Sequence, residues 1–331
     1  MARYLVTGAT GFIGAEVAKQ LLTRGHKVVA LVRSPEKASL LAKLGAELHT
    51  GDVTEPSTLA GPMDGVDGVF HLAAWYRIGV PRARALATAV NIDGTRHVLE
   101  AMREARVPKG VYTSSLAVFS DTHGQVVDET YRYTGAHVSL YDETKWEAHY
   151  QVALPAIAAG LPLVIVQPGA VYGPGDTSGL RDVFVRHLKR RLPFVPARTA
   201  YCWGHVDDVA HAHIEAMERG RPGESYIIAG PPHTLAEAVR LAAAASGRPA
   251  PVAGIPPALM RAAAGLASLA GRVVALPMAA QPETLRVLAG VTYLGSSAKA
   301  RKELGFAARP LDEGLRHLIE HEMRVLGLTP P

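Results

Sequence analysis

The stretch TGATGFIG, residues 7–14, places three glycines directly after the apolar run RYLVT and at the opening of an amphipathic segment. In a strand–turn–helix context, glycines let the turn close, let backbone N–H groups approach a pyrophosphate and let the helix pack tightly on the strand. The helix N-terminus adds positive potential. The stretch therefore predicts a dinucleotide-binding loop, formed by Gly8, Thr10, Gly11, Phe12, Ile13 and Gly14.

Short apolar runs alternate with helical segments from residue 3 onward. Strands are expected at RYLVTG, KVVALVR, AELHTGD, GVFHLAA, GVYTSS and LPLVIVQP, with helices at 14–23, 35–44 and 91–105 and around Tyr141. This alternation is typical of an α/β chain with a doubly wound parallel sheet. The pattern loosens after Gly173. We therefore expect a dinucleotide-binding domain over residues 1–173 and a smaller, mostly helical substrate lobe over 174–331, some of whose strands and helices can return to the main domain.

Composition narrows the class of partner. The chain has 331 residues, 48% of them apolar, and a formal net charge of +5, which favours an anionic small molecule over nucleic acid as ligand. The single cysteine, Cys202, forms no intramolecular disulfide, and the sequence begins with a strand rather than a signal peptide. We expect a cytoplasmic protein.

Two apolar segments need separate interpretation. Residues 152–171 contain no charge, but their three prolines and two glycines favour a helix end, a turn and a buried strand over a membrane span. Residues 250–282 are rich in Ala, Leu, Pro and Met. They predict helices over the mouth of the sheet, with a membrane-touching surface as the alternative.

The end of the second strand bears on the choice of dinucleotide. An Asp or Glu there usually meets a free 2′-hydroxyl, but this chain has Arg33, followed by Ser34 and Lys37. These donors suit a 2′-phosphate, so NADP(H) is favoured. NAD(H) is the alternative, with Arg33 stacked on adenine. Asp52, next to Val53 in GDVT, either accepts from the adenine amino group or caps a turn.

Further motifs follow in a fixed order: FHLAA at 70–74, VNIDGT around Asn91, YTSS at 112–115, YDETK at 141–145, QPGAVYGPGD at 167–176, GHVDDVA at 204–210 and KARKELGF at 299–306. Together with the glycine loop, these motifs resemble the extended short-chain dehydrogenase/reductases. That family includes sugar-nucleotide epimerases and dehydratases and dihydroflavonol-reductase-like enzymes. The resemblance implies a Rossmann-type fold, a nicotinamide dinucleotide, a small-molecule substrate and a homodimer.

The resemblance also assigns roles to residues. It implies that Tyr141 is the general acid/base, Lys145 its activator, Ser115 the hydrogen-bond donor to substrate, and Asn91 the holder of a proton-relay water near the lysine. A free phenol has a pKa of about 10, so it needs a nearby cation to act as a base at neutral pH. The i to i+4 spacing of Tyr141 and Lys145 puts both side chains on one helix face.

Further contacts are expected around the cofactor and substrate. The predicted cofactor contacts are Leu72, Ala73, Ala74, Thr113, Pro168, Gly169 and Ala170, together with Lys145, which the resemblance implies hydrogen-bonds the nicotinamide ribose. The predicted substrate contacts are Trp75, Tyr76 and Arg77, in a loop after a strand. His71 is expected to be a packed structural histidine. Many relatives have Arg at the position of Gln167, so no substrate contact is carried over to it.

Two charged clusters have competing interpretations. In GHVDDVAHAH the resemblance implies that the aspartates cap a helix N-terminus, and no metal is expected. The run VRHLKRRLPF, residues 185–194, is either a solvated helix face or a site for an anionic group of the substrate.

Three functions follow as alternatives. The first is an NADP(H)-dependent oxidoreductase acting on a carbonyl or secondary alcohol. The second is a sugar-nucleotide epimerase or dehydratase with tightly bound NAD, and the third is a non-catalytic dinucleotide sensor. The substrate itself is not identified, because the fold hosts many chemistries.

Overall fold

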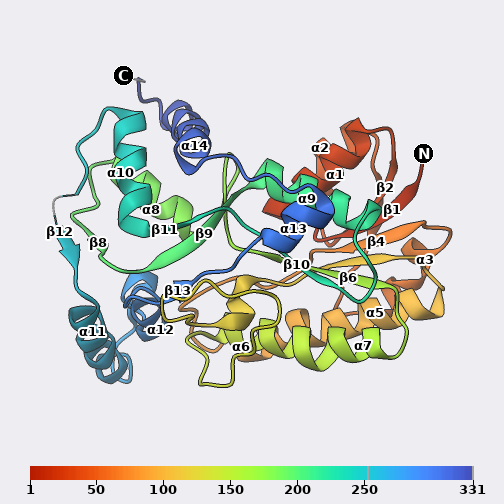
Figure 1. Ribbon diagram of the computed structural model, residues 1–331, viewed down its shortest axis with the longest axis horizontal. Helices are drawn as coiled ribbons and strands as arrows, with labels where there is room; N and C mark the ends of the chain where they lie inside the picture. Colours follow the sequence, from red (N-terminus) through yellow and green to blue (C-terminus); the bar gives the residue numbers. More distant parts are fainter. Residues whose placement is uncertain (252, 330–331) are drawn as a thin grey trace.

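A computed structural model describes residues 1–251 and 253–329 of the chain. Its centre is a seven-stranded parallel sheet with the strand order β10, β6, β5, β4, β1, β2, β3 (Figure 1). The strands are β1 Arg3–Thr7, β2 Lys27–Val32, β3 Glu47–Thr50, β4 Gly68–His71, β5 Gly110–Thr113, β6 Leu163–Pro168 and β10 Ser225–Ile228. The doubly wound parallel sheet predicted from the alternating pattern is confirmed.

A layer of helices covers each face of the sheet (Figure 1). On one face lie α1 Phe12–Thr23, α2 Ser39–Lys43, α9 Val206–Glu218 and α13 Ala298–Leu304; on the other lie α3 Ala60–Met63, α5 Gly94–Glu104 and α7 Leu154–Ala158. Both faces of the strands are therefore buried, which explains their nearly continuous apolar sequence.

Shorter elements connect these layers. They are the 3₁₀ turns η1 Pro35–Ala38, η2 Pro56–Thr58, η4 Leu116–Phe119 and η6 Met278–Ala280, the π-helical turns η3 Ala89–Asp93 and η5 Ala148–Ala153, and the helices α4 Arg84–Thr88 and α6 Leu140–Glu147. The helix predicted at 14–23 begins earlier, at Phe12, and the one predicted at 35–44 is divided into η1 and α2.

The uncharged segment 152–171 forms the end of η5, helix α7, a turn and strand β6, as its prolines and glycines predict. Across the described residues, no helix has both the length and the apolar character that crossing a membrane requires.

The C-terminal lobe packs around its own core. Its strands are β8 Phe194–Pro196, β9 Ala200–His205, β11 Pro232–Thr234, β12 Ala253–Ile255 and β13 Thr292–Tyr293, and its helices are α8 Gly179–Leu188, α10 Leu235–Ser246, α11 Pro257–Ala270, α12 Pro282–Val287 and α14 Leu311–Val325. Strand β7 Ala170–Tyr172, although it precedes residue 173, pairs with β9. Tyr172, Phe184, Trp203 and Leu315 are buried at the centre of this core. Strand β10, although it follows residue 173, pairs with β6 in the main sheet.

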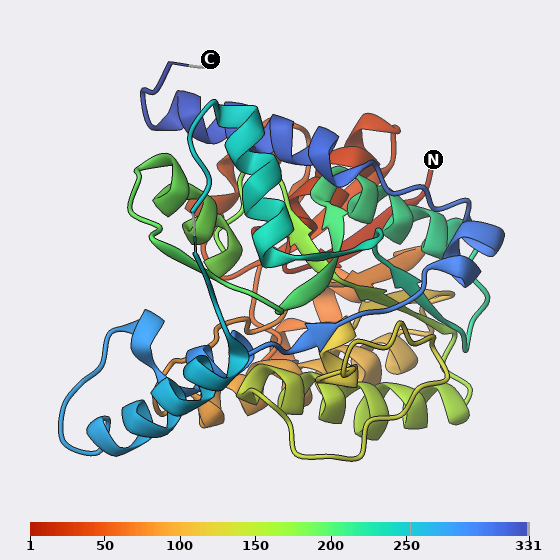
Figure 2. The same ribbon diagram turned by 60° about the vertical axis from the view of Figure 1, so that its left-hand side comes forward.

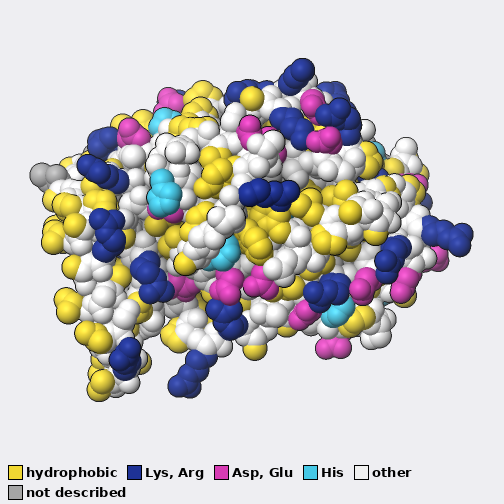
Figure 3. Space-filling view, turned by 60° about the horizontal axis from the view of Figure 1, so that its bottom comes forward, with side chains coloured by type: hydrophobic (Ala, Val, Ile, Leu, Met, Phe, Trp, Pro, Cys, Tyr) yellow, Lys and Arg dark blue, Asp and Glu magenta, His cyan; other side chains and the backbone are white. Residues whose placement is uncertain are grey.

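Helix α11 forms within the segment 250–282, but much of its surface is uncovered. Met260 and Ala264 are its buried residues, whereas Leu266 and Leu269 are 70% and 60% exposed. Figure 2 shows α11 projecting from the body of the lobe, and Figure 3 shows apolar side chains at that end of the molecule. The expected helix is present, yet these leucines do not pack over the sheet. Val252, in the same segment, lies outside the described residues.

Candidate active site

The glycine loop forms a cradle at the end of β1. Gly8 has a φ of +72°, and a Cβ on Gly14 would lie 2.2 Å from the carbonyl oxygen of Gly8. Gly11 is the N-cap of α1, where no side chain accepts from the helix amides and no acidic residue occupies the first turn. The first backbone amides of α1 and the positive end of the helix dipole fit a pyrophosphate group.

The residues predicted at the adenosine end lie at the ends of β2 and β3. Arg33 follows β2 with its side chain 74% exposed, and one guanidinium nitrogen lies 3.8 Å from a carboxylate oxygen of Asp52. Ser34 is half-buried and Lys37 is exposed. The other Asp52 oxygen accepts from the backbone amide of Thr54 at 3.0 Å, so Asp52 does cap a turn.

The remaining predicted cofactor residues lie after the carboxyl ends of parallel strands, which meet at one edge of the sheet. They are Thr10, Phe12 and Ile13 after β1, Val53 after β3, Leu72, Ala73 and Ala74 after β4, Thr113 at the end of β5, and Pro168, Gly169 and Ala170 at the end of β6. Val53 packs into the core between the sheet and α5. His71 lies buried between the hydroxyls of Thr7 and Thr95, as expected of a structural histidine.

Ser115, Tyr141 and Lys145 come together from two elements. Ser115 follows β5 and accepts from the amide of Ala117 at 3.1 Å, while Tyr141 and Lys145 lie on α6. Ser139 starts this helix by accepting from the amide of Asp142. The Ser115 side chain lies close enough to the Tyr141 hydroxyl to affect its pKa. The i to i+4 pair of Tyr141 and Lys145 therefore belongs to a cluster at the sheet edge.

Burial dominates the electrostatics of this cluster. It raises the pKa of Tyr141 well above its ordinary value, and the neighbouring Tyr76 adds to this effect, whereas the Ser115 side chain opposes it. Burial lowers the pKa of Lys145 to about 7. The Lys145 ammonium donates to the carbonyl of Thr113 at 2.8 Å and to the hydroxyl of Tyr112 at 3.2 Å. Without cofactor, Tyr141 is therefore held as a neutral phenol.

Asn91 occupies the π-helical turn η3 and fixes the loop after β4. Its carboxamide oxygen accepts from the amide of Trp75 at 2.7 Å, and its nitrogen donates to the carbonyl of Trp75 at 3.0 Å and to the hydroxyl of Thr144 at 2.9 Å. Asn91 thereby joins the predicted substrate loop to α6, next to Lys145. The water relay that the resemblance implies stays a prediction.

Aromatic side chains surround Tyr141. The ring of Tyr76 meets that of Tyr141 edge to face, with centroids 4.7 Å apart. Tyr201 on β9 and Tyr293 on β13 stack with centroids 5.9 Å apart, and both lie close enough to Tyr76 to interact electrostatically. Sequence reasoning missed Tyr201 and Tyr293; their position in AYCW and VTY, outside any recognised motif, gave no signal.

The charges around this aromatic wall are few and mixed. The charged groups that affect the pKa of Tyr76 are the carboxyl groups of Asp176 and Asp142 and the guanidinium of Arg77. Asp142 is buried and accepts hydrogen bonds from Ser139, Ser120 and Tyr293; burial raises its pKa to about 7. Arg77 itself is exposed.

The charged clusters weighed from the sequence lie apart from Tyr141. Lys189 and Arg191, from the basic run, line a surface groove with Arg248, Leu188, Leu326 and Leu328.

In GHVDDVA the N-cap of α9 is His205, which accepts from the amide of Asp207, while Asp208 pairs with Arg309. The expectation that the aspartates cap this helix is therefore wrong, because the histidine ring takes that place. Within the described part of the chain, no three His, Cys, Asp or Glu side chains gather as metal ligands.

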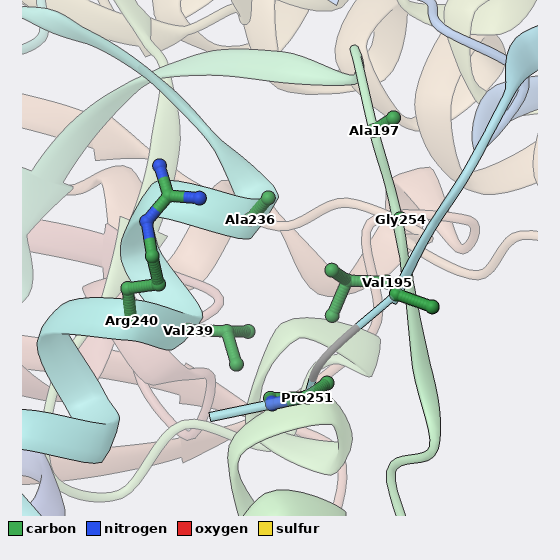
Figure 4. Close-up of a pocket in the computed structure, with 8 residues that line it drawn as sticks. Val195, Ala197, Ala236, Val239, Arg240, Pro251 and Gly254 are labelled. Atoms are coloured by element: carbon green, nitrogen blue, oxygen red, sulfur yellow. The ribbon is translucent and has the colours of Figure 1, made fainter. Parts of the chain in front are cut away.

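A separate pocket of about 190 Å³ lies between α10 and the paired strands β8 and β12 (Figure 4). Its lining is apolar apart from Arg240, and includes Val195, Val239 and Pro251. It contains none of the predicted site residues, so we do not assign it to the same site.

Comparisons with known proteins identify the family to which the chain belongs. The model of the NAD dependent epimerase/dehydratase family matches residues 4–229. A 4-hydroxy-2-methyl-3-oxo-4-farnesyl-3,4-dihydroquinoline-1-oxide ketoreductase from Stigmatella aurantiaca is 34% identical over 318 residues, which cover 93% of this chain and 92% of that protein. Sterol demethylase protein B from Methylococcus capsulatus is 31% identical over 262 residues, 78% of each chain.

The fold comparison extends over the whole molecule. The crystal structure of gox2253 superposes with a TM-score of 0.85 at 33% sequence identity, covering 99% of this chain and 100% of the other. The similarity therefore includes the C-terminal lobe as well as the sheet.

Proposed function

Because the chain belongs to the NAD dependent epimerase/dehydratase family and is an extended short-chain dehydrogenase/reductase, we propose that it is an NADP(H)-dependent oxidoreductase of an apolar carbonyl compound or secondary alcohol. The observation that carries the proposal is the proximity of the Ser115 and Tyr141 side chains beside an aromatic wall. The general acid/base is Tyr141.

In the direction of reduction, a nicotinamide held at this sheet edge would supply the hydride. Ser115 and Tyr141 place two hydroxyl groups beside one another, so the substrate oxygen accepts a hydrogen bond from each. Tyr141 then gives its proton to that oxygen as negative charge develops there. Burial keeps the phenol protonated beforehand, and Lys145, anchored on Thr113 and Tyr112, lies one helical turn away to favour the phenolate that remains.

The preference for NADP(H) rests on the end of β2. Arg33 is exposed and only distantly paired with Asp52, so its guanidinium is available to a phosphate, and Ser34 and Lys37 add donors nearby. Asp52 caps its own turn by accepting from the amide of Thr54.

The substrate class rests on the wall of the site. Tyr76, Tyr201 and Tyr293 offer aromatic surface near the proton donor, and the nearby charges include two carboxyl groups and one arginine. A nucleotide diphosphate carries several negative charges and needs a cationic site. The farnesylated ketone named for the Stigmatella relative suits an aromatic wall better.

Because the family includes epimerases and dehydratases, the competing function is that of a nucleotide-sugar epimerase or dehydratase. This function predicts that the purified protein already carries NAD and converts UDP- or dTDP-sugars without consuming external NADPH. The third candidate, a dinucleotide sensor, predicts that Tyr141→Phe changes no measurable property.

The test is a substrate screen on cofactor-free protein. We expect NADPH oxidation with apolar ketones or aldehydes, none with nucleotide sugars, and loss of at least about a hundredfold in kcat for Tyr141→Phe. Tyr133→Phe is the matched control, because the Tyr133 hydroxyl donates to the carbonyl of Ala136 in its own loop. Conversion of nucleotide sugars with retained NAD would overturn the proposal.

We also propose that the protein is a homodimer located in the cytoplasm. The one cysteine of the chain, Cys202, is buried and free, as suits a reducing compartment. Light scattering coupled to size-exclusion chromatography checks the oligomeric state, and a monomer would contradict it.

A further inference from the structure

Glu283, in the first turn of α12, joins two segments of the candidate site. One carboxylate oxygen accepts from the backbone amide of Leu140 at 2.5 Å, and the other accepts from the backbone amide of Gly79 at 2.7 Å. Leu140 is the first residue of α6, directly before Tyr141. Gly79 lies in the loop after β4 that also carries Tyr76. One side chain of the C-terminal lobe thus bridges the catalytic helix and the substrate loop.

The contact with Leu140 satisfies a helix terminus. The first amides of a helix have no intrahelical partner, and Ser139 accepts from Asp142 rather than from Leu140. A carboxylate at this end also interacts favourably with the helix dipole and makes a charge-assisted hydrogen bond. Glu283 therefore stabilises the turn that contains Tyr141.

The contact with Gly79 depends on close packing. Gly79 is buried and has a φ of +74°, and a Cβ there would lie 2.2 Å from the hydroxyl oxygen of Thr284. The loop thus lies directly against the start of α12. Only glycine permits this approach, so any side chain at residue 79 would move the loop away from Glu283.

A second contact from the lobe reaches the same turn of α6. The hydroxyl of Tyr293 donates to Asp142 at 3.0 Å. Leu140 and Asp142 flank Tyr141, and each is held by a residue from the last part of the chain, Glu283 and Tyr293.

We propose that Glu283 is a positioning residue that fixes Tyr141 and the Tyr76 loop relative to one another. The bridge, meaning the two hydrogen bonds of Glu283 with Leu140 and Gly79, does not depend on which reaction the protein catalyses. Its effect on catalysis rests on the proposed role of Tyr141 as proton donor. Loss of the Leu140 contact acts on kcat, since it displaces the proton donor. Loss of the Gly79 contact acts on KM, since it displaces the substrate wall.

Hydrogen exchange followed by mass spectrometry tests the bridge without any substrate. In Glu283→Ala, peptides containing Leu140 and Gly79 should exchange faster than in the wild type. The control is Glu237→Ala, which removes a similar carboxylate from the first turn of α10, where it accepts from the amide of Thr234 at 2.7 Å. Unchanged exchange at both peptides in Glu283→Ala would overturn the bridge.

Steady-state kinetics test the positioning role. For Glu283→Ala we expect kcat to fall about tenfold and KM to rise, the effect of losing charge-assisted hydrogen bonds. Gly79→Ala should raise KM with a smaller effect on kcat, and NADPH affinity should stay unchanged in both. If Glu283→Ala does not fold, Glu283→Gln, which keeps one acceptor oxygen, replaces it in both experiments.

The outcomes separate this inference from the proposed function. Faster exchange with wild-type kcat and KM would overturn the positioning role. If the wild type turns over no carbonyl compound at all, the proposed function fails, and the exchange result still decides whether Glu283 holds the two segments.

Discussion

The ring of Tyr76 stands edge-on to the ring of Tyr141, so a residue of the loop after β4 forms part of the wall around the proposed proton donor. Asn91 holds the same loop through both backbone groups of Trp75. The loop is therefore fixed at its start by Asn91 and at Gly79 by Glu283. The ring between these two points is in place before a substrate arrives.

Tyr76→Ala should raise KM for an apolar carbonyl substrate about tenfold, because an aromatic contact surface is lost. Tyr76→Phe keeps the ring and should stay near the wild type. Steady-state kinetics of the two variants provide the measurement. Equal KM values for Tyr76→Ala and the wild type would show that Tyr76 is no part of the substrate site.

Arg33→Ala should weaken NADPH binding by about ten- to a hundredfold and leave NADH binding nearly unchanged, because a charge-assisted contact with the 2′-phosphate is lost. Fluorescence titration of cofactor-free protein measures both affinities. Arg96→Ala is the control, since Arg96 pairs with Asp93 on the surface of the same domain. Equal losses for both dinucleotides would mean that Arg33 contacts adenine instead.

Lys145→Met should change the pH dependence of stability in cofactor-free protein. Burial lowers the pKa of Lys145 from 10.5 to about 7, so the folded protein binds fewer protons than the unfolded chain between these values. The wild type therefore carries the full cost of the buried ammonium below pH 7, and that cost disappears as the pH rises to 10.5.

Melting temperatures of the wild type and Lys145→Met across this range check the prediction. The melting temperature of the wild type should rise relative to that of the variant as the pH rises. The hydrogen bonds that the variant loses change its melting temperature by the same amount at every pH. A difference independent of pH would mean that Lys145 keeps an ordinary pKa.

Gly14→Ala should destabilise the protein and abolish dinucleotide binding, because the new Cβ would lie 2.2 Å from the Gly8 carbonyl oxygen. The matched control is Gly265→Ala in α11, where no atom lies within 4 Å of the added Cβ. That variant should be neutral or more stable by up to about 1 kcal/mol, since alanine favours helix. Thermal melting and NADPH titration distinguish the two; normal NADPH binding by Gly14→Ala would refute the proposed cradle.

The sequence predicts the sheet and its loop because both depend on local patterns. Ser115, Tyr141 and Lys145 could be placed together because they belong to two short motifs at the ends of neighbouring elements. Tyr201, Tyr293 and Glu283 could not be found in this way. Glu283 meets Leu140 across 143 residues of chain, and only the tertiary packing of α12 brings them together.

The interpretation of charged clusters shows the same limit. GHVDDVA predicts the start of a helix, yet which side chain caps it depends on the rotamer of His205 and on Arg309, which binds Asp208. The basic run 185–194 could be solvated or functional by composition alone, and its Lys189 and Arg191 lie in a groove that contains none of the predicted site residues.

The place of β10 in the sheet matters while the chain is being synthesised. Until residues 225–228 have left the ribosome, β6 is the edge of the sheet, and all of Leu163–Pro168 is apolar or buried in the finished fold. An unpaired apolar edge is prone to pair with another chain. In a chain that ends between residues 173 and 225, this apolar edge therefore has no partner strand, and β10 covers it in the finished fold.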